Sequence, residues 1–287
     1  MTKLSTQSDQ THHASKSDNM PDETAEVLVD YQGHIAIVTL NRPQARNAYS
    51  SLMIRQIVST LDELELNPEV RVLILTGAGS AFSAGGDLKL MRDKEGMFQG
   101  EALELRSRYM QEIHQVPRRL ARFSKPVIAA INGAAIGAGL DLSLMCDLRI
   151  SAQSAKFGST FVKVGLIPGD GGTYYLTRVI GLAKAIELTL TGRVISSQEA
   201  FNMGIISRVV ADEQLMESAL ELAQEIAQNA PIAVQLTKAA AYQSLNASPE
   251  GALQIAAGFQ GIAQNTSDHL EGVQAILERR APKFTGQ

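Results

Sequence analysis

The sequence predicts an α/β fold in which a parallel sheet with its helices is followed by a purely helical C-terminal segment. Four strand-like runs are rich in β-branched residues and mostly lack polar alternation, as is typical of strands buried on both faces. Helical segments separate these runs, which favours parallel strands joined by helices. After residue 210 the strand signal stops. The four runs are 34–40, 70–76, 126–131 and 148–151.

Helical patterns account for most of the remaining chain. Ser51–Leu66 follows the first strand, and the amphipathic stretch Gly100–Phe123 lies between the second and third. Pro231 and Pro249 fit the first turns of helices, where a missing N–H costs nothing. Much of the C-terminal surface is Ala, Leu and Ile, so we expect these helices to pack on something larger than each other. They are predicted at 212–227, 231–245, 249–264 and 268–280.

Composition restricts the class of protein. The 287 residues are 45% apolar and 20% charged, enough for one substantial core and a small second module. A net charge of −4 argues against a nucleic-acid partner. Residues 1–24 are polar and lack signal or transit features, so we predict a disordered tail. The apolar region 127–145 is interrupted by Asn132, glycines and Asp141, which argues against a membrane span.

The cysteine and histidine content argues against disulfide and metal chemistry. The single cysteine, Cys146, lies in an apolar run and cannot form an intrachain disulfide, which fits a reducing, cytoplasmic setting. We expect it to be a buried structural thiol. The five histidines have no metal-ligand spacing, so no metal site is predicted.

Two strand-to-helix junctions carry the chemistry. In Lys125–Asp141, an apolar run enters a bend of Asn, Gly and Ala, and then a helix predicted to start near Ala138. A helix start directs free N–H groups at an anion, and Asp141 follows one turn later. The second junction has Gly85 and Gly86 just before Asp87, which we expect to be a helix N-cap. Two facing junctions would supply a pair of N–H donors. Each alone is also explained as a tight turn with a capping Asp.

Taken together, these stretches resemble the crotonase (enoyl-CoA hydratase/isomerase) superfamily. The resemblance covers about Val27 to Phe284 and rests on six blocks in the family's order. The blocks are 40–48, 70–89, 125–151, 157–173, 187–210 and 271–284.

The resemblance implies a crotonase-like spiral of ββα units at 25–210 and a C-terminal helical oligomerisation module at 211–287. In the family this module makes a trimer, so the expected assembly is a homotrimer or a dimer of trimers. The substrate would be an acyl-CoA thioester. No cofactor is expected, because CoA is part of the substrate.

By resemblance, the backbone N–H groups of Gly86 and Ala138 form an oxyanion hole, which stabilises the charge that develops on a thioester oxygen. Asp141 matches the place where hydratases carry their first catalytic glutamate. Asp170, in a Gly-rich turn, falls where some branches place a catalytic acid, although Asp is also common in such turns. Phe161 stands where the second hydratase glutamate would be, and a phenyl ring cannot transfer a proton.

Other residues fall near the CoA end of the family's site. Arg46 and Lys89 would meet CoA phosphates, with Ala84, Gly86 and Asp87 beside them. Lys283 is a weaker candidate. Tyr174 and Tyr175 follow the Asp170 turn and are read either as proton donors or as packing residues.

Three functions stay open at this point. The chain is expected to be an enoyl-CoA hydratase/isomerase-type enzyme that works through an oxyanion-stabilised enolate. One alternative is a double-bond isomerase, like dienoyl-CoA isomerase, or a C–C bond hydrolase that uses Asp141 and Asp170. The other alternative is a non-catalytic acyl-CoA-binding protein of the same fold, which the loss at Phe161 favours and the two acids oppose.

Overall fold

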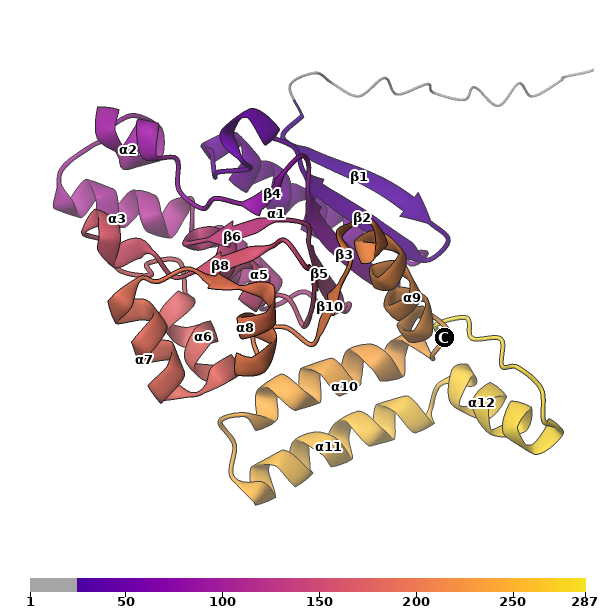
Figure 1. The fold of residues 1–287 in the computed structure, drawn as a ribbon. Coiled ribbons are helices and arrows are strands. Elements are labelled where there is room, and N and C mark those ends of the chain that lie inside the picture. Colours follow the sequence, from indigo (N-terminus) through magenta and orange to yellow (C-terminus); the bar gives the residue numbers. More distant parts are fainter. Residues whose placement is uncertain (1–24) are drawn as a thin grey trace, which may run out of the picture.

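The computed structural model describes residues 25–287, and its centre is a six-stranded sheet (Figure 1). The predicted tail at 1–24 lies outside the described residues. Five neighbouring strands are parallel, and only the first strand is antiparallel to its neighbour. In spatial order the strands are β1 (Val27–Gln32), β2 (Ile35–Leu40), β3 (Val72–Gly77), β5 (Val127–Ile131), β7 (Leu148–Ala152) and β10 (Arg208–Val210).

A second sheet of four short strands lies beside the first. Three parallel strands of the large sheet are each followed in the chain by a strand of the small one, so that β3 leads to β4, β5 to β6 and β7 to β8. This alternation is the predicted spiral of ββα units, and it brings successive strand ends to the same region. The small sheet contains β4 (Ala81–Ser83), β6 (Ala134–Ile136), β8 (Lys156–Gly158) and β9 (Ile195–Ser196).

Helices cover both sheets, and α1 (Ser51–Leu66) has the bounds that the sequence predicts. Ser50 caps its first turn by accepting a hydrogen bond from the Met53 N–H at 2.9 Å. Its apolar stripe is buried in the main core. The other helices of the spiral are α2 (Leu88–Asp93), α3 (Ala102–Gln111), α4 (Gln115–Leu120), α5 (Ala138–Met145), α6 (Gly172–Ile180), α7 (Leu182–Thr191) and α8 (Ser197–Met203).

The stretch Gly100–Phe123 is two helices, α3 and α4, and the prediction of one continuous helix is wrong. The backbone turns at Glu112, which has φ −112° and ψ −85°. Pro117 lies in the first turn of α4, where its missing N–H is tolerated, whereas in the interior of a long helix it would interrupt the hydrogen bonding. The break places His114 at the start of α4.

Helix α9 (Leu215–Ala227) packs on the outer face of the large sheet (Figure 1). Leu215, Ala219, Ala223 and Ala227 repeat at every fourth position and share a buried cluster with β2, β3, β5 and β7. Small alanines let the helix approach the strands closely. The C-terminal helical module was expected to begin at residue 211. Its first helix, α9, packs on the sheet of the core, and the outlying helices begin only after α9.

Those outlying helices are α10 (Pro231–Ser244), α11 (Pro249–Gln264) and α12 (Ser267–Glu278), and α10 and α11 lie side by side away from the sheet (Figure 1). Both prolines occupy the first turns, as predicted. One ionic contact ties α10 to the core: Lys238 Nζ lies 2.7 Å from Asp147 Oδ2. None of the helices in the described part has the length and apolar character needed to cross a membrane.

Candidate active site

The two predicted junctions meet in the structure. The turn at Gly85 leaves no room for a side chain, because a Cβ atom there would lie 2.8 Å from the Ala138 nitrogen. Gly139, on the other turn, is equally crowded, because a Cβ atom there would overlap the carbonyl of Ser83. Glycines at both positions therefore allow the two turns to pack backbone against backbone.

Gly86 and Ala138 line one small cavity of about 20 Å³. Ala138 is the first residue of α5, and Asp141 is the first residue in that helix whose N–H bonds back to the turn, through the carbonyl of Gly137. Gly86 is paired with Tyr49 in a parallel bridge, in which the Tyr49 N–H donates to Gly85 at 2.7 Å. Within residues 25–287, neither the Gly86 N–H nor the Ala138 N–H donates a hydrogen bond. The cavity thus has two free backbone donors, as an oxyanion hole requires.

Asp170 lines the same cavity, whereas Asp141 does not. Asp141 is fully buried behind it and lies against Gly172, where a Cβ atom would overlap the Asp141 carboxyl. Gly172 is the first residue of α6, so Asp141 faces the positive end of that helix. The two predicted acids therefore have different surroundings, and only Asp170 faces the donors directly.

The two carboxyl groups are held in an unusual electrostatic state. In the described part of the chain, none of their four oxygens has a hydrogen-bond partner. Burial raises the pKa of Asp141 well above its usual value, and the nearby Asp170 carboxyl raises it further. Burial also raises the pKa of Asp170, while the Asp141 carboxyl and the charge of His114 lower it. Burial therefore disfavours charge on both carboxyl groups, and more strongly on Asp141.

Phe161 lies at the edge of this cavity, beside the turn that precedes α5. Its ring is 3.7 Å from the position of a Cβ atom on Gly137. The phenyl ring therefore occupies space next to Ala138, and no carboxyl group is present at this position. Asp170 is the acid that lines the cavity together with Phe161.

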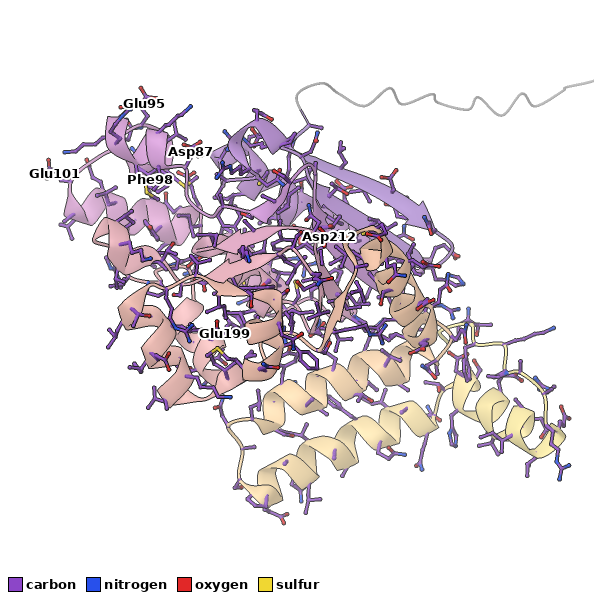
Figure 2. The ribbon with its side chains drawn as sticks, viewed as in Figure 1. Asp87, Glu95, Phe98, Glu101, Glu199 and Asp212 are labelled. Atoms are coloured by element: carbon purple, nitrogen blue, oxygen red, sulfur yellow. The ribbon has the colours of Figure 1, made fainter. Side chains whose placement is uncertain are left out.

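Methionine and aromatic side chains close the cavity from the direction of α2 and α3. Met91 extends over Gly86, since a Cβ atom on Gly86 would overlap the Met91 methyl group. Met97 and Phe98 complete this cover, and Figure 2 labels Phe98 between α2 and α3. The site is filled by these flexible side chains and holds almost no free space.

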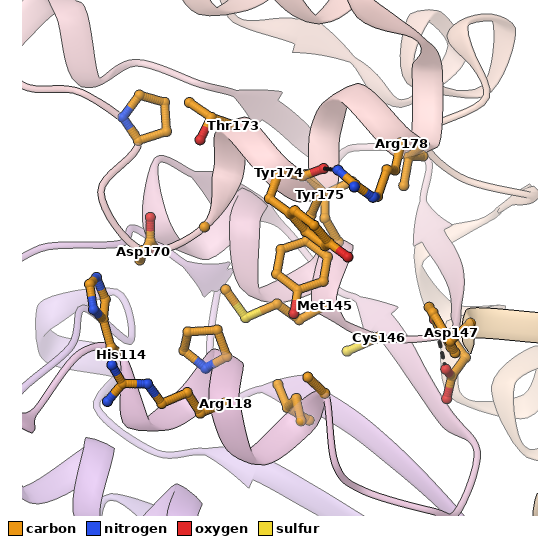
Figure 3. A pocket seen from close by; sticks show the side chains of 18 of the residues that line it. His114, Arg118, Met145, Cys146, Asp147, Asp170, Thr173, Tyr174, Tyr175 and Arg178 are labelled. Atoms are coloured by element: carbon orange, nitrogen blue, oxygen red, sulfur yellow. Dashed lines mark hydrogen bonds between the residues drawn. The ribbon is translucent and has the colours of Figure 1, made fainter. Parts of the chain in front are cut away.

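Beyond Asp170 lies a larger cavity of about 810 Å³ between α4, α6 and α10. Figure 3 shows Asp170 and His114 at one end, with Tyr174, Tyr175 and Met145 along its wall. Asp170 lines both the large cavity and the small one. It therefore lies between the two free backbone donors and the larger cavity.

The residues predicted near the CoA end have mixed placements. The Arg46 carbonyl accepts a hydrogen bond from the Ala84 N–H at 2.9 Å, so these two residues are adjacent, and Lys89 is exposed at the start of α2. Asp87 is the N-cap of α2, as expected, and its carboxylate accepts from the Lys89 N–H at 3.0 Å. Lys283 is exposed near the C-terminus.

The tyrosines of α6 pack against neighbouring side chains, and the cysteine is buried. Tyr174 stacks under the Arg178 guanidinium at 3.5 Å, and Tyr175 packs edge-on against Tyr174. Cys146 is buried, and burial raises the pKa of its thiol to about 12, which keeps it unreactive. Within residues 25–287, no three His, Cys, Asp or Glu side chains converge as metal ligands would.

Two residues that no sequence pattern indicated also belong to this region. Tyr49 lines the small cavity with its hydroxyl buried. His114 Nε2 lies 2.8 Å from the carbonyl of Gly169, and because a carbonyl only accepts, Nε2 carries the hydrogen. Figure 3 shows His114 directed toward Asp170. Both come from segments distant in the sequence, so only the folded chain identifies them.

A fold of this topology with paired backbone donors beside a buried acid defines an enzyme class that stabilises an oxyanion. The solved enoyl-CoA hydratase from Bacillus anthracis superposes with a TM-score of 0.85 and 38% identity, covering 92% of this chain and 100% of that one. The family model for enoyl-CoA hydratase/isomerase matches residues 30–287. The chain belongs to the enoyl-CoA hydratase/isomerase family and has its crotonase fold.

Individual relatives have different activities at nearly the same similarity. A probable enoyl-CoA hydratase of Mycobacterium leprae is 39% identical over 260 residues, which is 90% of this chain and 97% of the relative. The 1,2-epoxyphenylacetyl-CoA isomerase of Escherichia coli is 38% identical over 261 residues, 91% of this chain and 98% of the relative. Overall identity does not distinguish a lyase from an isomerase here. The reaction type therefore has to be inferred from the residues of the site.

Proposed function

We propose that this protein is an acyl-CoA double-bond isomerase in which Asp170 moves the proton and Gly86 and Ala138 bind the thioester oxygen. The observation that carries the proposal is that Asp170 is the carboxyl group in the small cavity, where Phe161 supplies none. Adding water across a double bond needs one group to activate the water and another to protonate carbon. Moving a double bond needs a single base that returns the proton it takes.

In the proposed reaction, the Asp170 carboxylate removes a proton from C2 of a 3-enoyl-CoA. The electrons of the C–H bond move into the thioester, whose oxygen becomes an oxyanion held by the N–H groups of Gly86 and Ala138. Asp170 then returns the same proton to C4, and the double bond lies between C2 and C3. No atom is gained or lost, and no cofactor takes part.

The surroundings of Asp170 suit this role. A raised pKa makes the carboxylate a stronger base than a carboxylate in water, so it is closer to the range needed to remove a proton from carbon. Asp141 holds its own proton behind it and adds no second negative charge to the buried site. The larger cavity beyond Asp170 supplies space for the rest of the acyl chain.

The CoA part is proposed to lie on the side of Arg46, Ala84, Gly86, Asp87 and Lys89. Arg46 and Lys89 are exposed, and within residues 25–287 neither forms an ion pair, so both are free to meet phosphates. Asp87 contributes as the cap that starts α2, next to Gly86.

We also propose that the chain works as a trimer or a dimer of trimers in the cytoplasm. The outlying helices α11 and α12 expose large apolar side chains, among them Leu253, Ile262, Leu270, Ile276 and Leu277. A monomer that left this much apolar surface in water would be prone to association. Contact with other copies of the chain would cover it.

Product analysis tests the reaction type. Purified protein is incubated with 3-enoyl-CoA and, separately, with 2-enoyl-CoA in D2O, and products are identified by NMR and mass spectrometry. The proposal expects a product of unchanged connectivity with a moved double bond from the first substrate. Addition of water to the second, at a rate comparable to or above that of isomerisation, would instead establish a hydratase. Cleavage of a β-diketone substrate would favour a C–C bond hydrolase. Binding without turnover of any of these would indicate a non-catalytic acyl-CoA-binding protein.

A further inference from the structure

Arg42 is a largely buried cation in the turn that follows β2. Only 15% of its side chain is exposed. Its guanidinium contacts three separate segments of the chain. Nε lies 3.0 Å from Glu26 Oε1, Nη1 donates to the Ala48 carbonyl at 2.6 Å, and Nη2 lies 3.5 Å from Asp87 Oδ2. A planar group with several donors in fixed directions is suited to holding such segments in one arrangement.

Two of these contacts lie on either side of the Gly86 bridge. Asp87 follows Gly86 in the chain, and Ala48 precedes Tyr49, which is paired with Gly86 in the parallel bridge. This bridge lies outside the strands of both sheets. Arg42 thus connects the two partners of the bridge through their neighbours, and it supplies support that a longer strand ladder would otherwise give.

The direction of the Gly86 N–H needs such support. Glycine has more conformational freedom than other residues, so the peptides beside it rotate at low cost. On one side, Gly85 is fixed by its close packing against Ala138. On the other side is Asp87, which Figure 2 labels and whose Oδ1 accepts from two N–H groups of α2. Its second oxygen, Oδ2, faces Arg42.

The charge of Arg42 is already balanced within the protein. Glu26 and Asp87 both face its guanidinium, and only 19% and 15% of their side chains are exposed. A cation enclosed by two carboxylates is poorly placed to meet a phosphate, in contrast to the exposed Arg46. Its surroundings therefore favour a role in orienting the site over a role in binding CoA.

We infer that Arg42 is a positioning residue of the oxyanion hole, which keeps the Gly86 N–H directed into the small cavity. The inference rests on the proposed binding of the thioester oxygen by Gly86 and Ala138. Arg42 does not line that cavity, so it would act on the thioester only through Gly86. Without the guanidinium, the Gly86–Asp87 segment would be freer to move, and one of the two donors would be weakened without being removed.

Infrared spectroscopy of a bound thioester tests the inference without any turnover. Butanoyl-CoA labelled with carbon-13 at its thioester carbonyl is added to wild type, Arg42→Met and Arg46→Met, and the carbonyl stretching frequency and Kd are measured. The wild type should lower the frequency of the free ligand, because the two N–H donors polarise the carbonyl. Arg42→Met should move the frequency back toward that of the free ligand with little change in Kd. Arg46→Met, the matched control, should weaken binding and keep the wild-type frequency.

Steady-state kinetics provide a second measurement on a substrate that the wild type turns over. Arg42→Met should lower kcat by about 10- to 100-fold and leave KM nearly unchanged, because a displaced donor loses most of its effect on the transition state. If Arg42→Met does not fold, Arg42→Lys decides, since it keeps the charge but reaches fewer partners. An intermediate carbonyl frequency in Arg42→Lys would support the inference, and the wild-type frequency would overturn it.

The remaining outcomes separate this inference from the proposed function. A wild-type frequency equal to that of the free ligand would overturn the proposed oxyanion hole and, with it, the role of Arg42. A lowered frequency that Arg42→Met keeps in full would overturn the role of Arg42 alone. Weaker binding by Arg42→Met at an unchanged frequency would instead make Arg42 a ligand of the CoA phosphates.

Discussion

Asp170 and Asp141 are neighbouring buried carboxyl groups, and only Asp170 faces the cavity of the two free backbone donors. Asp141 lies behind it against Gly172, at the start of α6. Two acids that share low-dielectric surroundings cannot both ionise easily, so one holds a proton while the other carries the charge. This division of roles leads to the first two predictions.

Asp170→Asn should lower turnover by about 10²- to 10⁴-fold while leaving acyl-CoA binding almost intact, because the amide has the shape of the acid but cannot take a proton. Asp141→Asn is the matched control. Asp141 is expected to act in its protonated form, which an amide imitates, so turnover should fall by less than about tenfold. Steady-state kinetics and binding titrations measure both. Full activity of Asp170→Asn on every substrate that the wild type accepts would show that the proton moves elsewhere.

Asp141 should make the protein less stable as the pH rises. Its folded-state pKa lies well above the value of 3.8 expected in the unfolded chain. The stability linked to its proton is fully present below the unfolded pKa and is lost as the pH rises through the folded pKa. Relative to wild type, Asp141→Asn should therefore gain in free energy of unfolding as the pH increases.

Urea denaturation at several pH values checks this trend, with Asp212→Asn as a contrast. The pKa of Asp212 is lowered by its hydrogen bonds with Ser154, and Figure 2 labels this exposed residue. Stability from Asp212 is present above its unfolded pKa and is lost as the pH falls, so its variant should show the opposite trend. The same trend for both variants would contradict the state assigned to Asp141.

His114 should act on Asp170 in two separable ways. His114→Phe removes the donor to the Gly169 carbonyl and should reduce kcat by about 10- to 100-fold, because the peptide that carries Asp170 is less well positioned. His114→Gln keeps an N–H donor but loses the imidazole, whose electrostatic interaction lowers the pKa of Asp170. In that variant the rise of rate with pH should move to higher pH, with kcat at the optimum mostly kept. Unchanged pH profiles in both variants would leave His114 with a packing role only.

Gly86→Pro should lower turnover by about 100-fold or more, because it removes one of the two oxyanion donors. Gly86→Ala is the control, since it keeps the N–H. Its added methyl group would meet the end of the Met91 side chain, which is flexible and can move aside. Turnover of the alanine variant should stay within about tenfold of wild type. Equal losses in both variants would indicate that crowding near Met91, and not the missing donor, is responsible.

Sedimentation should give a mass of three or six times the 30.9 kDa of one chain at micromolar concentration. Ile276→Lys combined with Leu277→Lys places charge on two side chains that are 79% and 74% exposed in a single chain. If α12 lies between copies, this variant should sediment as a smaller species. A monomeric wild type would remove the basis for the proposed assembly.

Local patterns predicted much of the fold because their physical causes are local. The bounds of α1 follow from a Ser cap and an apolar stripe, and Asp87 caps α2 as its position before a helix indicates. Pro117 was the available signal for the break between α3 and α4. The place of α9 could not be read in this way, because an alanine face packs equally well on a sheet or on another helix.

The candidate site is less visible from the sequence for a different reason. Sequence motifs contain Gly86, Ala138 and the two acids. Such motifs are recognisable because a turn that exposes backbone donors needs particular residues at fixed spacing. Tyr49, His114 and Met91 come from three other segments, and nothing in their neighbouring residues distinguishes them from core or surface side chains. Their roles depend on which strands and helices lie next to each other, which is a property of the whole fold.

The cover of Met91, Met97 and Phe98 over Gly86 has a further consequence for how the protein responds to its ligand. Thioether and phenyl groups, and not solvent, occupy the space that a thioester would take. Binding would therefore replace one apolar, polarisable group by another. Little hydration has to be stripped from the donors, and the heat of binding should come mainly from contacts with the incoming sulfur and oxygen. Met91 is only partly buried, so its oxidation to the sulfoxide would place a polar group over Gly86 and should weaken binding of the thioester.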